Sequence, residues 1–178
     1  ALARVAVAGG DWYAAWLALP DADRPALRTY TLSAVRPAAD GSGEVDIDIV
    51  VHACDGPAAP GMAFATEAAL GASTILVAGD ATRPGHDVAG VAWHPGDATD
   101  VLLVGDETAL PAIVNIAATL PASTTGRLIL EVPHAADVRT VVAPDGVQVS
   151  WRVREDGERA EGVFGRPAGA QPDDDDLL

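Results

Sequence analysis

The chain of 178 residues has one cysteine, no lysine and no apolar run approaching the length of a membrane-spanning helix. Such a helix needs about 20 consecutive apolar residues, so no membrane anchor is expected. With Cys54 alone, neither an intrachain disulfide nor a multi-cysteine metal or iron–sulfur site is available. Redox chemistry would therefore require a bound cofactor, and Cys54 is expected to be a small buried hydrophobe.

Basic residues are also scarce. The chain has 11 of them, all arginine, against 26 acidic residues, which gives a formal charge of −15. Nucleic-acid binding needs clustered basic side chains, so no nucleic-acid partner is expected. The first ten residues lack the basic leader and apolar stretch of a signal peptide, which predicts a cytoplasmic location.

What is present is typical of a globular protein, with 49% apolar and 21% charged residues. The length suits one substantial domain or two small ones. The first half is predicted to form short strands separated by turns, with a strand expected over residues 4–8 and a helix over residues 11–19. Its clearest feature is a hairpin, because residues 27–35 and 44–52 alternate in polarity around the Asp40-Gly41 turn.

In the second half of the chain, the spacing of apolar residues changes. Residues 100–104 form an apolar strand, residues 108–120 a helix and residues 126–132 a second apolar strand, which together predict a βαβ unit in a parallel sheet covered on both faces. The predicted fold class is thus an antiparallel β-barrel followed by a partial parallel α/β domain. The expected domains are 1–97 and 98–154, with 155–178 as an acidic loop or linker rich in Pro and Gly.

Arg28-Thr29-Tyr30-Thr31 is the first candidate binding motif. In a strand, Arg28 and Tyr30 point to the same face, so a guanidinium and a phenol ring lie side by side. The pair could hold a nucleotide cofactor, with Arg28 on a phosphate and Tyr30 on a planar ring. An exposed arginine stacked on a surface tyrosine is the alternative, and the spacing alone favours it.

Four elements in sequence order resemble the FAD-binding siderophore-interacting proteins, a branch of the ferredoxin–NADP reductase-like superfamily. The family's Arg-x-Tyr-Ser/Thr motif is matched by Arg28, Tyr30 and Thr31, and its strand ending in His by His52. Its Gly-Pro-Ala element and its Gly-Asp-Glu-Thr-Ala-x-Pro-Ala signature then follow. They are found here as Gly56-Pro57-Ala58 and as Gly105-Asp106-Glu107-Thr108-Ala109-Leu110-Pro111-Ala112.

The resemblance implies roles for the first motif: Arg28 binds an FAD phosphate, Tyr30 packs against the isoalloxazine and Thr31 hydrogen-bonds near its redox-active edge. His52 would lie close by, and a strand-end histidine bonded to backbone is an equal alternative. Gly56, Pro57 and Ala58 would form a phosphate-facing helix start. Relatives carry a tryptophan a few residues later, whereas this chain has Pro60-Gly61-Met62-Ala63-Phe64.

Gly105, Asp106, Glu107 and Thr108 occupy the place where related reductases bind a nicotinamide nucleotide. Asp106 and Glu107 would repel a pyrophosphate, so the electrostatics of this candidate nicotinamide site oppose that role. NAD(P)H is therefore expected as the electron donor by family analogy alone. A ferredoxin-like carrier is the other candidate donor. His86 and His94 lie near acidic residues, but their spacing is not that of a metal site, and no metal is expected.

The resemblance implies an FAD-dependent ferric-siderophore reductase that reduces Fe(III) to Fe(II) during iron acquisition. Electron transfer through the flavin requires no assigned catalytic residue, and the partner is a ferric siderophore. Two alternatives stay open: a flavin- or siderophore-binding module without turnover, and a general flavin reductase. Relatives capture anionic chelates with a basic C-terminal stretch that is not found here, so a C-terminal part and an initial barrel strand are expected to be missing.

Overall fold

The computed structural model describes residues 12–51, 56–79 and 93–154. The chain divides into two compact units, with Ala1–Tyr30 and Val51–His94 in unit 1 and Thr31–Val50 and Pro95–Leu178 in unit 2. The hairpin region thus belongs to the same unit as the α/β region. The domain bounds expected from the sequence stay a prediction.

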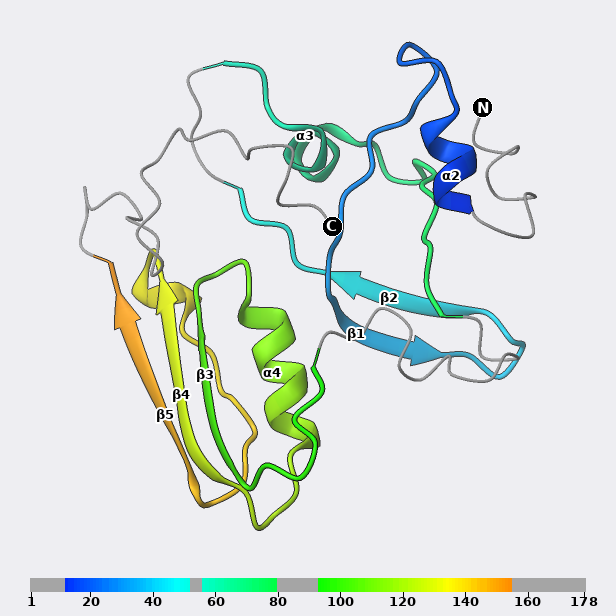
Figure 1. Ribbon diagram of the computed structural model, residues 1–178. Helices are drawn as coiled ribbons and strands as arrows, with labels where there is room; N and C mark the ends of the chain where they lie inside the picture. Colours follow the sequence, from blue (N-terminus) through cyan, green and yellow to red (C-terminus); the bar gives the residue numbers. More distant parts are fainter. Residues whose placement is uncertain (1–11, 52–55, 80–92, 155–178) are drawn as a thin grey trace. The chain divides into compact units, whose positions relative to one another are not determined.

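Unit 2 contains a three-stranded parallel sheet in the order β3-β4-β5. The strands are β3 (Asp100–Gly105), β4 (Thr125–Val132) and β5 (Val147–Val153), and helix α4 (Leu110–Thr119) connects β3 to β4. A short 3-10 helix, η1 (Ala135–Asp137), lies between β4 and β5. The predicted βαβ unit is confirmed, and α4 lies against the sheet (Figure 1).

The core of unit 2 lies where α4 packs on the sheet. Buried residues recur along α4 at the three- and four-residue spacing of a helix face, as Leu110, Ile113 and Ala117 show. In the sheet, Leu128 and Leu130 are fully buried. The other face is open among the described residues: 65% of Leu102 and 40% of Ile129 is exposed. The expected burial of both faces is therefore wrong for this part of the chain, because α4 covers one face.

Gly105, the last residue of β3, allows α4 to approach the sheet closely. A Cβ atom at this position would lie 2.6 Å from Cβ of Ala109 and 2.7 Å from Cδ1 of Ile113. Any side chain here would push the helix away from the strand, so the glycine of the Gly-Asp-Glu-Thr signature has a packing role.

The predicted hairpin is confirmed, with shorter strands. Strand β1 (Leu32–Pro37) pairs antiparallel with β2 (Gly43–Ile47), and Asp40 accepts a hydrogen bond from the Ser42 amide at 2.9 Å in the turn. The Arg28–Thr31 segment was expected inside a strand but precedes β1. The ladder ends at Leu32 opposite Ile47, after an irregularity in register. Residues 28–31 therefore have no paired strand, and the described antiparallel sheet is a hairpin rather than a closed barrel.

Side chains connect the hairpin to the rest of unit 2. Asn115 of α4 donates from Nδ2 to the Leu32 carbonyl at 2.8 Å, and Arg139 pairs with Asp48 at 3.0 Å. A two-stranded hairpin is only marginally stable alone. These contacts explain why it clusters with the α/β region.

The described residues of unit 1 form two short helices, α2 (Trp12–Leu17) and α3 (Pro60–Glu67). The predicted helix over residues 11–19 is confirmed in its central part, and Trp16 donates from its indole to the Pro25 carbonyl at 2.9 Å. The strand expected at residues 4–8 lies outside the described residues. No helix of the described part is both long and apolar enough to cross a membrane.

Candidate functional site

Arg28 and Tyr30 lie against the first turn of α3 at Gly61. A Cβ atom built on Gly61 would overlap the Tyr30 hydroxyl oxygen and would lie 3.2 Å from Tyr30 Cζ and 3.9 Å from Arg28 Cγ. Both side chains therefore occupy the space in front of this one glycine. The Arg-x-Tyr motif and the segment that follows Gly56-Pro57-Ala58 meet within unit 1.

The Arg28 guanidinium is exposed and carries no ion pair with a described residue. Its Nη1 donates to the carbonyl oxygen of the preceding residue, Leu27, at 2.6 Å. A guanidinium has five N–H donors in a planar fork, so donors remain for an anion. This geometry suits a phosphate group of a nucleotide cofactor.

Helix α3 begins at Pro60, not at Gly56-Pro57-Ala58 as expected. The residue before a proline is pushed out of the helical region, and Ala59 is extended, with φ −58° and ψ 148°. A helix begun at Pro57 would therefore be interrupted at Ala59. The first turn of α3 contains no acidic residue and no side-chain cap, which leaves the positive end of its dipole open to an anion.

The remaining residues of the predicted flavin site are less well defined. Gly56 and Pro57 are exposed, whereas Ala58 and Thr31 are partly buried. His52 lies outside the described residues, so its expected contact stays a prediction. The structure thus brings Arg28 and Tyr30 together with the start of α3.

In unit 2, the turn after β3 is organised around the Asp106 carboxylate. Asp106 Oδ1 accepts hydrogen bonds from the Thr108 amide at 2.9 Å, the Thr108 hydroxyl at 2.6 Å and the Ala109 amide at 3.3 Å. Partial burial opposes ionisation, but the hydrogen bonds from Thr108 and Ala109 outweigh it and lower the pKa of Asp106. Two N–H groups that a phosphate would use are therefore bound by the chain's own carboxylate.

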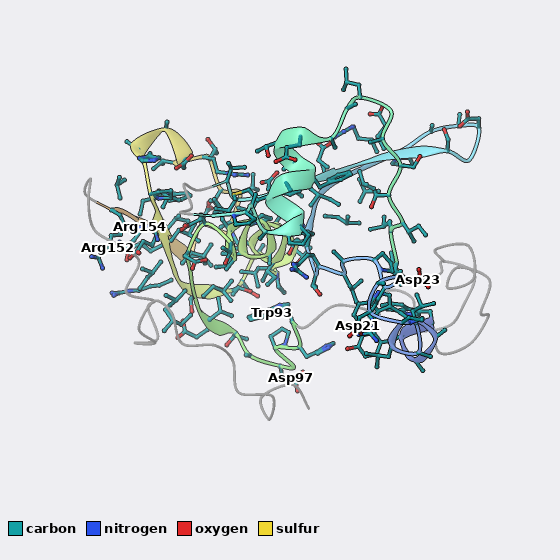
Figure 2. The ribbon with its side chains drawn as sticks, turned by 90° about the horizontal axis from the view of Figure 1, so that it is seen from above. Asp21, Asp23, Trp93, Asp97, Arg152 and Arg154 are labelled. Carbon is teal, nitrogen blue, oxygen red and sulfur yellow. The ribbon has the colours of Figure 1, made fainter. Side chains whose placement is uncertain are left out.

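Glu107 belongs to a charge cluster at the carboxyl ends of the parallel strands. Arg154, 9% exposed at its side chain, pairs with Glu107 at 2.6 Å and with Glu131 at 3.5 Å, and Arg152 pairs with Glu131 at 3.3 Å. Figure 2 shows Arg152 and Arg154 at the end of β5. The hydrogen bond to Glu107, despite partial desolvation, raises the pKa of Arg154. Glu107 is thus neutralised within the chain.

These contacts change the reason why a nicotinamide nucleotide is not favoured at the turn after β3. Repulsion by Glu107 is offset by Arg154, whereas Asp106 blocks the turn by occupying its N–H groups. The position at the carboxyl end of a parallel strand is typical of ligand sites in α/β sheets. A nicotinamide role for Gly105, Asp106, Glu107 and Thr108 stays a prediction, and the closed turn does not favour pyrophosphate binding there.

Sequence reasoning missed Arg154, Glu131 and Gly61. Glu131 stands within the apolar strand β4, and a buried acid in such a strand is a signal for a charged partner. No comparable local signal predicts Gly61, because its neighbour Tyr30 is remote in sequence. The histidine-based metal site was not expected, and the described ranges hold no group of three side chains suited to a metal.

Comparison with known proteins bears on both halves of the chain. Residues 3–82 match the family model of the siderophore-interacting FAD-binding domain, and residues 98–168 match that of the siderophore-interacting protein. The chain belongs to the siderophore-interacting protein family, and the resemblance inferred from the four motifs is confirmed.

Among curated proteins, an uncharacterized Mycobacterium tuberculosis protein is 38% identical over 144 residues, or 80% of this chain and 44% of that protein. The ferric vibriobactin reductase ViuB of Vibrio cholerae is 31% identical over 132 residues, or 74% of this chain and 43% of ViuB. The chain thus spans less than half the length of these curated relatives.

Solved structures of the family are also similar. The siderophore-interacting protein SipS from Aeromonas hydrophila shares 31% identity at a TM-score of 0.53, covering 79% of this chain and 50% of SipS. A siderophore utilization protein from T. fusca shares 25% identity at a TM-score of 0.51, covering 78% of this chain and 46% of that one. The mixed α/β architecture is therefore that of this family.

Proposed function

We propose that this chain supplies the FAD-binding part of an oxidoreductase that reduces Fe(III) held in a siderophore to Fe(II). The observation that carries the proposal is the meeting of Arg28 and Tyr30 with the first turn of α3 at Gly61. It gathers a free guanidinium, an aromatic ring and an uncapped helix start in the part of the chain that matches an FAD-binding domain. Phosphate and planar ring are the two features of FAD that such groups recognise.

The donor set fits FAD, and each group has a distinct task. Arg28 and the amides at the start of α3 bind the phosphates, and the ring of Tyr30, 39% exposed, packs on the isoalloxazine. Thr31 and His52 are proposed at the redox-active edge, with Gly56, Pro57 and Ala58 leading the chain into α3.

FAD, when bound, supplies one-electron transfer to ferric iron. Hard oxygen ligands hold Fe(II) less tightly than Fe(III), so reduction favours release of the metal. The chain's own residues then need no acid–base triad: Arg28 and α3 hold the cofactor, and Tyr30 fixes its orientation. We also propose that the electron donor is NAD(P)H or a ferredoxin-like carrier. The proposed location of the protein is the cytoplasm.

The first test is FAD binding by the full chain and by Arg28→Ala. Loss of the charge-assisted contact should weaken FAD affinity about 10- to 100-fold without changing the unfolding midpoint of the free protein. Arg127→Ala is the matched control, because this exposed arginine lies in β4, and it should bind FAD as the unchanged chain does. Equal affinity of Arg28→Ala and the unchanged chain contradicts the proposed site.

Turnover is tested separately. The flavin of the loaded protein is reduced chemically under anaerobic conditions and mixed with ferric vibriobactin, the chelate named for the Vibrio relative, or with ferric citrate. Reoxidation of the flavin with appearance of Fe(II) is expected. A flavin that stays reduced with both chelates contradicts the reductase activity and leaves a flavin-binding module.

A further inference from the structure

We propose that Gly61 is a positioning residue for the flavin site: its missing side chain makes the room in which Tyr30 and Arg28 are held against α3. The inference rests on the proposed function. It adds a role for the missing side chain of Gly61, which acts through the two side chains proposed to contact the cofactor.

The first argument is steric. The Tyr30 hydroxyl occupies the position of a Cβ atom on Gly61, and Tyr30 Cζ would be only 3.2 Å from that atom. Contacts closer than ordinary van der Waals distance require the neighbour to move. An alanine at position 61 would therefore displace the phenol ring, and the stem of Arg28, 3.9 Å away, lies beside the same spot.

The second argument comes from the helix itself. Apart from proline, glycine is the least favourable residue for a helix, so Gly61 weakens α3. The next residue, Met62, is 7% exposed and anchors this turn of the helix. A shift of the helix to admit a Cβ atom would disturb the burial of Met62, whereas Tyr30, 39% exposed, has room to move. The glycine therefore lowers helix stability but leaves space for the Tyr30 hydroxyl beside α3.

The third argument concerns which part of Tyr30 remains free. Its hydroxyl end lies against Gly61, yet 39% of the residue is exposed. A ring held at its tip while much of its surface stays open is ready to pack on a planar ligand. Fixing it in advance lowers the entropy lost when the ligand binds.

The test is a double-mutant cycle on FAD affinity in the full chain. Gly61→Ala should weaken FAD binding about tenfold, because the displaced ring loses its stacking contact. In the Tyr30→Phe background, which lacks the oxygen that collides, the same substitution should weaken binding less than about threefold. The absorbance spectrum of the bound flavin should change with Gly61→Ala and return toward that of the unchanged chain in the double variant.

Ala65→Gly is the control for helix stability, since Ala65 is an exposed residue of α3. It weakens the helix but should leave FAD affinity unchanged. Equal effects of Gly61→Ala in the tyrosine and phenylalanine backgrounds, or no effect in either, would overturn the inference while Arg28-dependent FAD binding stands. Absence of FAD binding by the unchanged chain would instead overturn the proposed function and the inference with it.

Discussion

The two units differ in how much core surrounds their candidate sites. In unit 2, α4 and the parallel sheet bury nine hydrophobic residues, three of them with 0% exposure, and the turn after β3 packs on this core. Among the described residues of unit 1, Met62 alone is a buried hydrophobic side chain. Arg28, Tyr30 and α3, which are proposed to hold FAD, therefore lie in the unit with the smaller described core, and a ligand that binds the folded form of this unit should stabilise it.

The segments that lead into α3 and α4 also differ. In the turn after β3, Asp106 accepts hydrogen bonds from the amides of Thr108 and Ala109, which precede α4. Neither α3 nor α4 has a side-chain cap or an acidic residue in its first turn. The difference that an anion would detect therefore lies in the turn before α4, where the Asp106 carboxylate already binds two amides.

Among substitutions that compare the two units, the largest loss of stability is expected at Arg154 in unit 2. Arg154→Met removes the partner of Glu107 and one of the two partners of Glu131, and it leaves Glu107 poorly solvated, which should lower the free energy of unfolding by about 3 kcal/mol. Urea unfolding followed by circular dichroism measures it. Arg36→Met is the control, because the Arg36–Asp46 pair is about half exposed and solvent screens it. A loss at Arg154 no greater than at Arg36 would contradict the structural importance of the cluster.

A smaller effect is expected in the turn before α4. Asp106→Ala removes the carboxylate that accepts hydrogen bonds from the Thr108 and Ala109 amides and should lower the free energy of unfolding by about 1 kcal/mol at neutral pH. Because the folded-state pKa of Asp106 is lowered, its contribution is complete above the unfolded-state pKa of about 4 and is lost as pH falls through the folded-state value. The stability gap between the two proteins should therefore shrink below about pH 4.

Asp145→Ala provides the comparison for this experiment, since Asp145 is an exposed acid in the turn before β5. It should leave the free energy of unfolding at neutral pH nearly unchanged. If the gap between Asp106→Ala and the unchanged chain stayed constant down to pH 2, the ionised carboxylate would not be the stabilising species.

The elements with a strong local period could be predicted from the sequence. The apolar runs of β3 and β4 on either side of an amphipathic helix specified the βαβ unit, and the polar alternation around Asp40-Gly41 specified the hairpin. Strand β5 was missed because Val147–Val153 alternates in polarity, which is typical of a half-buried antiparallel strand, yet it pairs parallel to β4.

The features that were not predicted from the sequence depend on contacts between residues that are distant in the chain. The Arg28–Thr31 segment has strand-like composition, but a strand needs a partner, and the ladder stops at Leu32. The pairing of Glu107 with Arg154 joins residues 47 apart, and Tyr30 meets Gly61 only when α3 has formed. The residue types at the candidate site were therefore predictable, whereas the groups that position or neutralise them were not.

Hydrogen exchange of the full chain with and without FAD tests the central claim most directly. If FAD is held by Arg28, Tyr30 and the start of α3, amides at residues 28–31 and in α3 should become protected, while those of the Asp106 turn should change little because they are already bonded. Protection confined to the turn after β3, with residues 28–31 and α3 unaffected, would contradict the account.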